Sequence, residues 1–109
     1  MNTFQNIQPI LTDLKQSLQT LYGERLASLI LFGSYARNEA REDSDIDILM
    51  VLNDDEIAPF TEIDKISDIT FQLLLDKGKV IQVVPTNKDK YEHQLNPLYI
   101  QIRKQGILL

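Results

Sequence analysis

Residues 29–51 read LILFGSYARNEAREDSDIDILMV, in which a polar segment separates two apolar runs. An apolar run begins at Ala27 and ends before Gly33, which is typical of a short strand buried on both faces. From Asp45, alternating acidic and apolar residues lead into a second apolar run and predict a second strand. The polar residues 34–44 between the two runs predict a loop or a short exposed helix at the surface.

The sequence on either side predicts three helices and a third strand. We expect helices from about Gln8 to Gly23, from after Pro59 to Lys77, and from Asn96-Pro97 to Gly106, with a strand over residues 80–84 that Pro85 ends and a polar turn over residues 86–88. The order α-β-β-α-β-α predicts an α/β (α+β) fold. We expect one domain over residues 1–109, with a mixed sheet of three or slightly more strands flanked by helices.

The composition excludes several classes of function. The chain has 16 acidic and 11 basic residues, and its formal charge of -5 disfavours direct binding to a nucleic-acid backbone. It has no cysteine and one histidine, which excludes thiolate and histidine-rich metal sites. Residues 1–5 lack the basic start of a leader, and no apolar run is long enough to span a bilayer. We therefore expect a soluble cytoplasmic protein that binds no membrane.

Asp45 and Asp47 are the first candidate functional residues. Because side chains alternate along a strand, both carboxylates should lie on the same face of the second strand. Two adjacent negative charges disfavour joint ionisation unless a cation lies between them, and Mg²⁺ prefers carboxylates together with phosphate oxygens. The alternative is a solvated strand edge, which an isolated Asp-x-Asp often marks.

Gly33 and Ser34 are candidates for phosphate binding. They follow the first strand at its carboxyl end, where open α/β sheets bind ligands, and a glycine lets an anion approach the backbone. Arg37 and Arg41 are four residues apart and are available either for phosphate or for ion pairs with Glu39, Glu42 or Asp43. We assign Arg37 to the nucleotide-binding residues. The turn and the carboxylates together predict a site for a triphosphate with Mg²⁺.

Gly33-Ser34, ten further residues and Asp45-x-Asp47 form the pattern GSx10DxD. On this pattern the chain resembles the DNA polymerase β-like nucleotidyltransferase superfamily, and residues 33–47 look like its minimal, single-domain branch. The resemblance implies transfer of a nucleoside monophosphate from a nucleoside triphosphate to an acceptor, with loss of pyrophosphate. It also implies that Asp45 and Asp47 are catalytic and hold Mg²⁺ while Gly33 and Ser34 hold the terminal phosphates.

Gln82 departs from the pattern of this superfamily. The resemblance implies a third carboxylate in the middle of the third strand, where it would hold a second metal ion, and Gln82 stands at that position. An amide oxygen can coordinate a cation but brings no charge and cannot act as a base. Three interpretations follow: weak catalysis, replacement of the carboxylate by Asp76 or Asp89, or a site that only binds nucleotide.

Three functions are compatible with these residues. The minimal branch resembles the antitoxins of HEPN/MNT toxin–antitoxin pairs, which implies AMP transfer from ATP to a tyrosine of a HEPN ribonuclease toxin and a hetero-oligomer with that toxin. A nucleotidyltransferase acting on a small molecule such as an antibiotic is the second, although such enzymes use an additional helical domain for the acceptor. A catalytically weak module that binds nucleotide and neutralises its partner by contact is the third.

Overall fold

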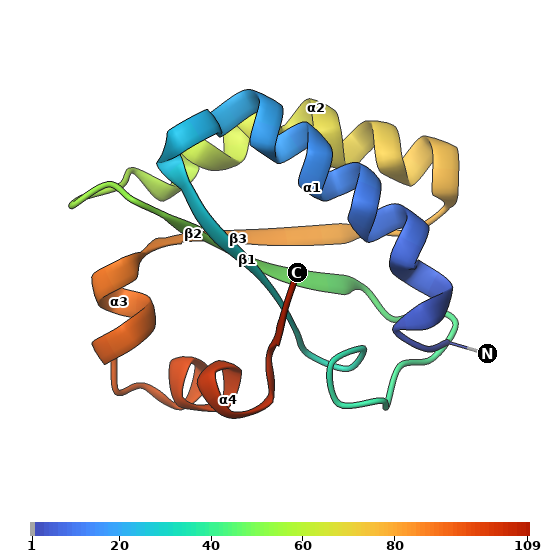
Figure 1. Cartoon of the computed structure of the whole chain (residues 1–109). Coiled ribbons are helices and arrows are strands. Elements are labelled where there is room, and N and C mark those ends of the chain that lie inside the picture. The colour runs from blue at the N-terminus through green and yellow to red at the C-terminus, as the bar shows by residue number, and fades with distance from the viewer. Residues whose placement is uncertain (1) are drawn as a thin grey trace.

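The computed structural model describes residues 2–109, which fold around one mixed sheet (Figure 1). Its elements in chain order are α1 (Gln8–Tyr22), β1 (Leu26–Phe32), β2 (Ile46–Leu52), α2 (Pro59–Lys77), β3 (Ile81–Asn87), α3 (Lys88–His93), α4 (Pro97–Gln105) and β4 (Ile107–Leu108). Short 3-10 turns at Gln5–Ile7 and Gly23–Arg25 flank α1. The predicted fold class, a mixed sheet flanked by helices, is confirmed.

The sheet has the strand order β3-β2-β1-β4. β1 runs antiparallel to both β2 and β4, whereas β2 and β3 are parallel and are joined through α2. In this register Phe32 pairs with Asp47, and Asp47 pairs with Gln82 on its other side. The end of β1 and the starts of β2 and β3 therefore lie at one end of the sheet.

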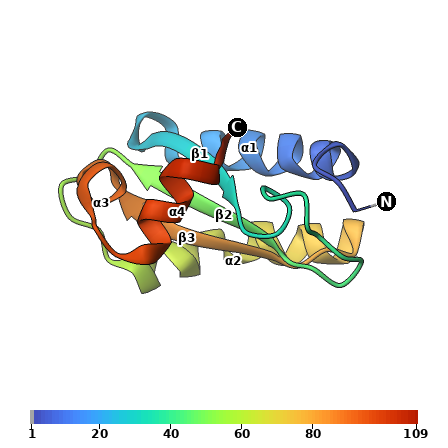
Figure 2. The same ribbon diagram turned by 90° about the horizontal axis from the view of Figure 1, so that it is seen from below.

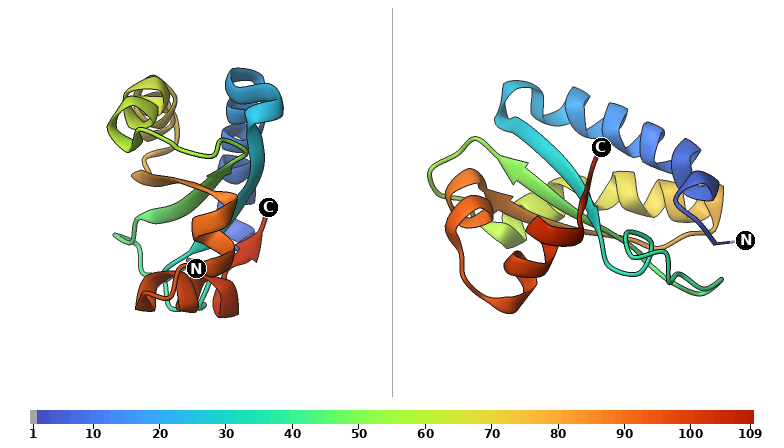
Figure 3. Two further views of the ribbon diagram at one scale, coloured as in Figure 1. Left: turned by 90° about the vertical axis from the view of Figure 1, so that its left-hand side faces the viewer. Right: turned by 60° about the horizontal axis from the view of Figure 1, so that its bottom comes forward.

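The helices form a layer on each face of the sheet. α1 and α2 lie side by side over one face (Figures 1 and 3), and α3 and α4 lie over the other (Figure 2). Along β2, Ile46, Ile48 and Met50 belong to the core under α1 and α2, while Leu49 and Val51 pack with Ile102 of α4. Asp47 alternates with the first set, so it points to the α4 side. No helix within residues 2–109 is both long and apolar enough to cross a bilayer.

The third strand is longer than the sequence predicts. β3 continues through Pro85 to Asn87, and the expected polar turn over residues 86–88 is absent from this part of the structure. Proline is tolerated because β3 is an edge strand, where an N–H is not needed on the side facing solvent. Asn87 instead caps α3, because its side-chain oxygen accepts a hydrogen bond from the backbone N–H of Lys90 at 2.9 Å.

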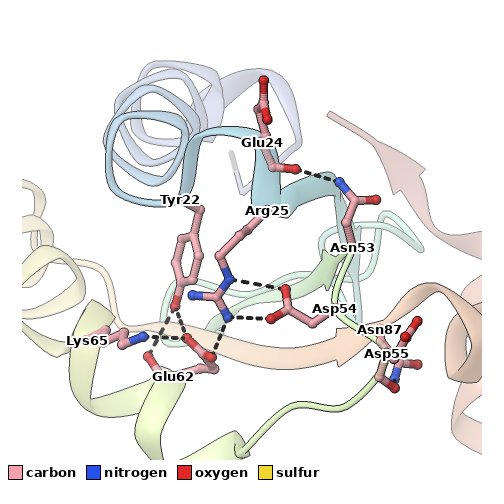
Figure 4. A network of polar contacts seen from close by, with 9 residues as sticks. All are labelled: Tyr22, Glu24, Arg25, Asn53, Asp54, Asp55, Glu62, Lys65 and Asn87. Carbon is pink, nitrogen blue, oxygen red and sulfur yellow. Dashed lines mark hydrogen bonds and ion pairs between the residues drawn. The ribbon is translucent and has the colours of Figure 1, made fainter.

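A polar network ties four segments together at the end of the molecule where α1 meets β1 (Figure 4). The guanidinium of Arg25 donates to Asp54 at 3.1 Å and to Glu62 at 2.8 Å. The hydroxyl of Tyr22 donates to the other oxygen of Glu62 at 2.9 Å. Because Glu62 is only 4% exposed, these donors replace the water that its carboxylate loses on folding. The network joins α1, the start of β1, the segment after β2 and the first turn of α2.

Candidate active site

The turn after β1 brings its backbone against the carboxylate of Asp47. Gly33 has a φ of 78°, and a Cβ at this position would overlap Asp47 Oδ2 and lie 3.2 Å from its Cγ. Only glycine combines this backbone conformation with so close an approach. The carbonyl of Gly33 then accepts hydrogen bonds from the N–H groups of Ala36 and Arg37, at 3.1 and 3.2 Å. Residues 34–38 thus form consecutive turns and not a helix.

One cavity unites all three predicted nucleotide-binding residues with one of the two predicted catalytic residues. Its volume is about 350 Å³, and its wall includes Gly33, Ser34, Arg37 and Asp47. The remaining wall is formed by Phe32, Ala36 and, from the other end of the chain, Leu98, Gln101, Ile102, Gln105 and Gly106. This volume lies within the range of small-molecule sites in proteins. Asp45 lies beside the cavity and not in its wall.

The two aspartates lie close enough to influence each other. Burial raises the pKa of Asp47 above its ordinary value, and the negative charge of Asp45 raises it further, while Arg37 partly offsets both effects. Both residues are half-buried, and Asp45 lies one residue before β2, which begins at Ile46. The like charges on one face of the sheet favour a bound cation.

Arg37 is placed to act on phosphate but already has a partner. Its Nε donates to Glu39 Oε2 at 3.2 Å, so the ion pair that the sequence offered as an alternative is present. The partner is well exposed, at 66% of its side-chain area, and such pairs are weak in water. Arg37 also lines the cavity. It can therefore exchange Glu39 for a ligand anion there at a small cost in free energy.

Gln82 stands next to the aspartates, where the third carboxylate was expected. Its Nε2 donates to Asp45 Oδ2 at 2.8 Å, and its Cα is paired with that of Asp47 in the parallel ladder. Gln82 is exposed on the edge strand. Within residues 2–109, no three acidic or histidine side chains form a group that could hold a metal ion.

The structure separates Asp76 and Asp89 from this site, so neither replaces the missing carboxylate. Asp76 lies on α2 and lines a groove between α1 and α2, on the opposite face of the sheet. Asp89 lies on α3, which follows β3 at the end opposite to Gln82, and its carboxylate contacts His93 Nδ1 at 3.2 Å.

The donor set fits one divalent cation. Asp45 and Asp47 can supply two negatively charged oxygen ligands, and the charge of Asp45 adds to the effect of burial in raising the pKa of Asp47. Gln82 supplies an amide oxygen that can rotate toward an ion only if its hydrogen bond to Asp45 is given up. A pair of adjacent ions needs more bridging carboxylates than these.

Sequence reasoning missed the wall that α4 contributes. Leu98, Gln101 and Gln105 are spaced by three and four residues, so they share one face of α4. The sequence predicted this helix, and the spacing of these three residues can be read from the sequence. That this face lines the same cavity as Gly33 could not be predicted locally, because it depends on the packing of Ile102 against Ile30 of β1.

Both the sequence and the fold of this chain are similar to those of known proteins. The family model of the nucleotidyltransferase domain matches residues 11–108. A Methanocaldococcus jannaschii protein, named as a candidate protein adenylyltransferase, is 33% identical over 91 residues, which cover 84% of each chain. The protein adenylyltransferase MntA of Thermococcus cleftensis is 48% identical over 50 residues, 46% of this chain and 48% of that one. A crystal structure of a toxin–antitoxin with AMP-PNP shares the fold, with a TM-score of 0.59 and 20% identity over 87% of this chain and 68% of that one.

Proposed function

Because the chain belongs to the nucleotidyltransferase domain family, we propose that it transfers AMP from ATP to a hydroxyl group of a protein. The observation that carries this proposal is the cavity in which Gly33, Ser34 and Arg37 face Asp47, with Asp45 beside it. A phosphate-binding turn and a carboxylate pair at the same end of the sheet are what phosphoryl transfer requires. The names of the relatives, which are protein adenylyltransferases, support AMP as the group and a protein as the acceptor.

In the proposed reaction the hydroxyl oxygen of the acceptor attacks the α-phosphorus of ATP. An oxygen–phosphorus bond forms, the bond between the α-phosphorus and the oxygen bridging to the β-phosphate breaks, and pyrophosphate leaves. The hydroxyl proton passes to water, because Gln82 has no basic group to accept it. Ser34 and the backbone at Gly33 bind the terminal phosphates, and Arg37 neutralises part of their charge.

We propose that Asp45 and Asp47 hold Mg²⁺ with the phosphates. When bound, this ion neutralises negative charge on the transferring group and on the leaving pyrophosphate. The carboxylates and the ion would hold the nucleotide against the turn at Gly33, where the backbone lies next to Asp47. Positioning and charge neutralisation account for most catalysis of this kind.

The proposed acceptor is a tyrosine of a HEPN ribonuclease toxin, and the proposed role is that of its antitoxin. Support comes from the GSx10DxD pattern, which resembles the minimal nucleotidyltransferases of such pairs, and from the toxin–antitoxin structure of similar fold. We place the reaction in the cytoplasm, and we expect a hetero-oligomer with the toxin. ATP is the nucleotide bound.

The test combines the purified protein with Mg²⁺, ATP labelled at the α-phosphate, and, as the acceptor, the product of the adjacent reading frame. We expect label on a tyrosine of the partner, identified by mass spectrometry, and a loss of about 100-fold or more in Asp45→Asn and Asp47→Asn. Asp76→Asn is the matched control, because its carboxylate lies on the opposite face of the sheet. Absence of label with the wild-type protein would overturn the proposed activity.

Gln82 favours a second candidate, a nucleotide-binding module that neutralises its partner by contact. An uncharged residue at the third ligand position removes the acid that a second ion needs. On this view the partner binds tightly without becoming labelled, and Asp45→Asn leaves the affinity of the complex unchanged. The labelling experiment therefore separates the two candidates when binding is measured alongside it.

A further inference from the structure

α4 presents a face to the cavity that the phosphate chemistry does not use. Leu98, Gln101 and Gln105 lie on this face, and all three line the same cavity as Gly33 and Asp47. None of the three carries a charge, and Leu98 is 44% exposed although it is a large apolar side chain. An exposed apolar group beside two amides, all turned toward one cavity, is typical of a binding surface for an uncharged ring.

The two glutamines bind each other and thereby present a fixed pattern. Gln101 Nε2 donates to Gln105 Oε1 at 3.2 Å. This bond leaves one amide with a free oxygen and the other with free N–H groups, and exchanging the roles of both amides gives the same result. The pair therefore always offers one acceptor and one donor side by side. The edge of a nucleobase carries a donor next to an acceptor, and glutamine amides recognise adenine through such pairs.

We propose that this face of α4, with Leu98, Gln101 and Gln105, binds the nucleobase of the nucleotide, with Phe32 as a second apolar wall. This inference rests on the proposed function, because it assumes that the phosphates lie at Gly33 and Ser34. A nucleotide has one strongly charged end and one flat, uncharged end. The cavity is divided in the same way, with Arg37 on one side and the neutral face of α4 on the other. Apolar contact with a base supplies affinity that does not depend on which base is bound.

Two features hold α4 close enough to β1 for this role. Ile102, on the neighbouring face of α4, packs against Ile30 in the core and is 2% exposed. Gly106 then ends the helix where a Cβ would lie 2.6 Å from both the carbonyl of Ile102 and a methyl group of Ile30. The backbone at residue 106 must therefore lack a side chain for α4 to pack at this distance.

The acceptor is a poorer fit to the α4 face than the base. Asp45 and Gln82 lie outside the cavity wall, and Gln82 is exposed on the edge strand β3. A hydroxyl of another protein can reach the site from this open side without entering the cavity. If the base occupied the β3 side instead, the acceptor would have to enter between α4 and the turn at Gly33.

The test compares two probes by isothermal titration calorimetry in Mg²⁺: ATP, and inorganic tripolyphosphate, which has no base. We expect Gln101→Leu and Gln105→Leu each to weaken ATP binding by about 5-fold to 10-fold, the range for the loss of one hydrogen bond. Tripolyphosphate affinity should stay within about 2-fold of wild type, because its contacts are made at Gly33 and Ser34. Gln72→Leu is the matched control, since Gln72 also bonds to a residue four positions on, at 3.1 Å, but on α2.

The outcomes separate this inference from the function on which it rests. Unchanged ATP affinity in both variants, with wild-type binding intact, would overturn base binding by α4 and leave the proposed function in place. An equal loss for ATP and tripolyphosphate would also overturn it, because α4 would then affect the phosphates or the fold. If the wild-type protein binds neither probe, the proposed function fails, and the inference fails with it.

Discussion

Asp47 is a residue at which stability and function oppose each other. Burial and the charge of Asp45 raise its pKa, so its ionised form is less favourable in the folded protein than in the unfolded chain. Above the raised pKa, ionised Asp47 therefore destabilises the fold. Within residues 2–109 the structure contains no hydrogen bond that would compensate its carboxylate. A bound cation would supply that compensation.

Replacing Asp47 by asparagine should therefore stabilise the protein when no cation is bound. In chelator at pH 7 we expect Asp47→Asn to raise the free energy of unfolding by about 1 kcal/mol, measured by urea denaturation. Added Mg²⁺ should stabilise the wild type by mass action but not the variant. Asp45→Asn is the comparison: it should gain less, because Asp45 already accepts a hydrogen bond from Gln82. A destabilised Asp47→Asn in chelator would contradict this account.

The sequence was enough to predict that Asp45 and Asp47 lie on one face near a turn, but not that Arg37 pairs with Glu39. Alternation placed Asp45 and Asp47 on one face, and a glycine after a buried strand predicted a turn near them, because both patterns are local. Whether Arg37 pairs with Glu39 depends on side-chain rotamers in a loop of consecutive turns. The resemblance placed Gln82 beside the aspartates, and the parallel ladder does pair it with Asp47. It lies near the start of β3 and not in the middle, because the strand continues to Asn87.

Among the elements, the strands were easier to predict than the segments that join them. β1 and β2 each contain a continuous apolar run, so burial on both faces was readable from the sequence. The end of β3 was wrong, because proline was taken to stop a strand without knowledge that this strand lies at an edge. In α1, Leu18 is buried, but Leu21 is 46% exposed and Tyr22 takes the next core position.

The junction of β3 and α3 is held by the side chain of Asn87. Asn87 is 5% exposed; its oxygen caps α3 at Lys90, and its Nδ2 donates to the carbonyl of Asp55 at 2.8 Å. Asn87→Ala removes both the cap of α3 and the bond to Asp55, so we expect a loss of about 2 kcal/mol in the free energy of unfolding.

The matched control is Asn87→Asp, which keeps the capping oxygen but lacks the donor to Asp55. It should lose about half as much stability as Asn87→Ala in the same urea titrations. ATP affinity should be unchanged in both variants, because Asn87 pairs with Leu52 at the opposite end of β2 from Asp47. Equal losses in the two variants would show that the cap contributes nothing.

In the whole molecule, the helix layers on the two faces of the sheet have different roles. The α1 and α2 layer covers the larger core cluster, and its polar network closes the end of the molecule near the start of β1 (Figure 4). The α3 and α4 layer covers a smaller cluster and forms the cavity wall. Because the network and the cavity lie on opposite faces, stability and nucleotide binding can be altered independently.

The pH dependence of stability at Glu62 tests whether stability can be altered without changing nucleotide binding. Burial opposes its ionisation, but hydrogen bonds from Arg25 and Tyr22 outweigh that effect and lower its pKa below the ordinary 4.5. As the pH falls, the unfolded chain therefore binds this proton before the folded protein does. The stabilisation is complete above about pH 4.5 and is lost as the pH falls through the lowered value.

We expect Glu62→Gln to lower the free energy of unfolding by about 2 kcal/mol at pH 7, because Arg25 loses a buried charged partner. The difference from wild type should shrink as the pH falls below about 4.5 and through the lowered pKa of Glu62, because the wild-type carboxylate then becomes protonated. Urea titrations across this range measure both effects, and Glu92→Gln, at an exposed position of α3, serves as the control. A constant difference between the proteins at all pH values would show that Glu62 acts through its shape and not its charge. ATP affinity at pH 7 should be the same in Glu62→Gln and wild type, because the network lies across the sheet from the cavity.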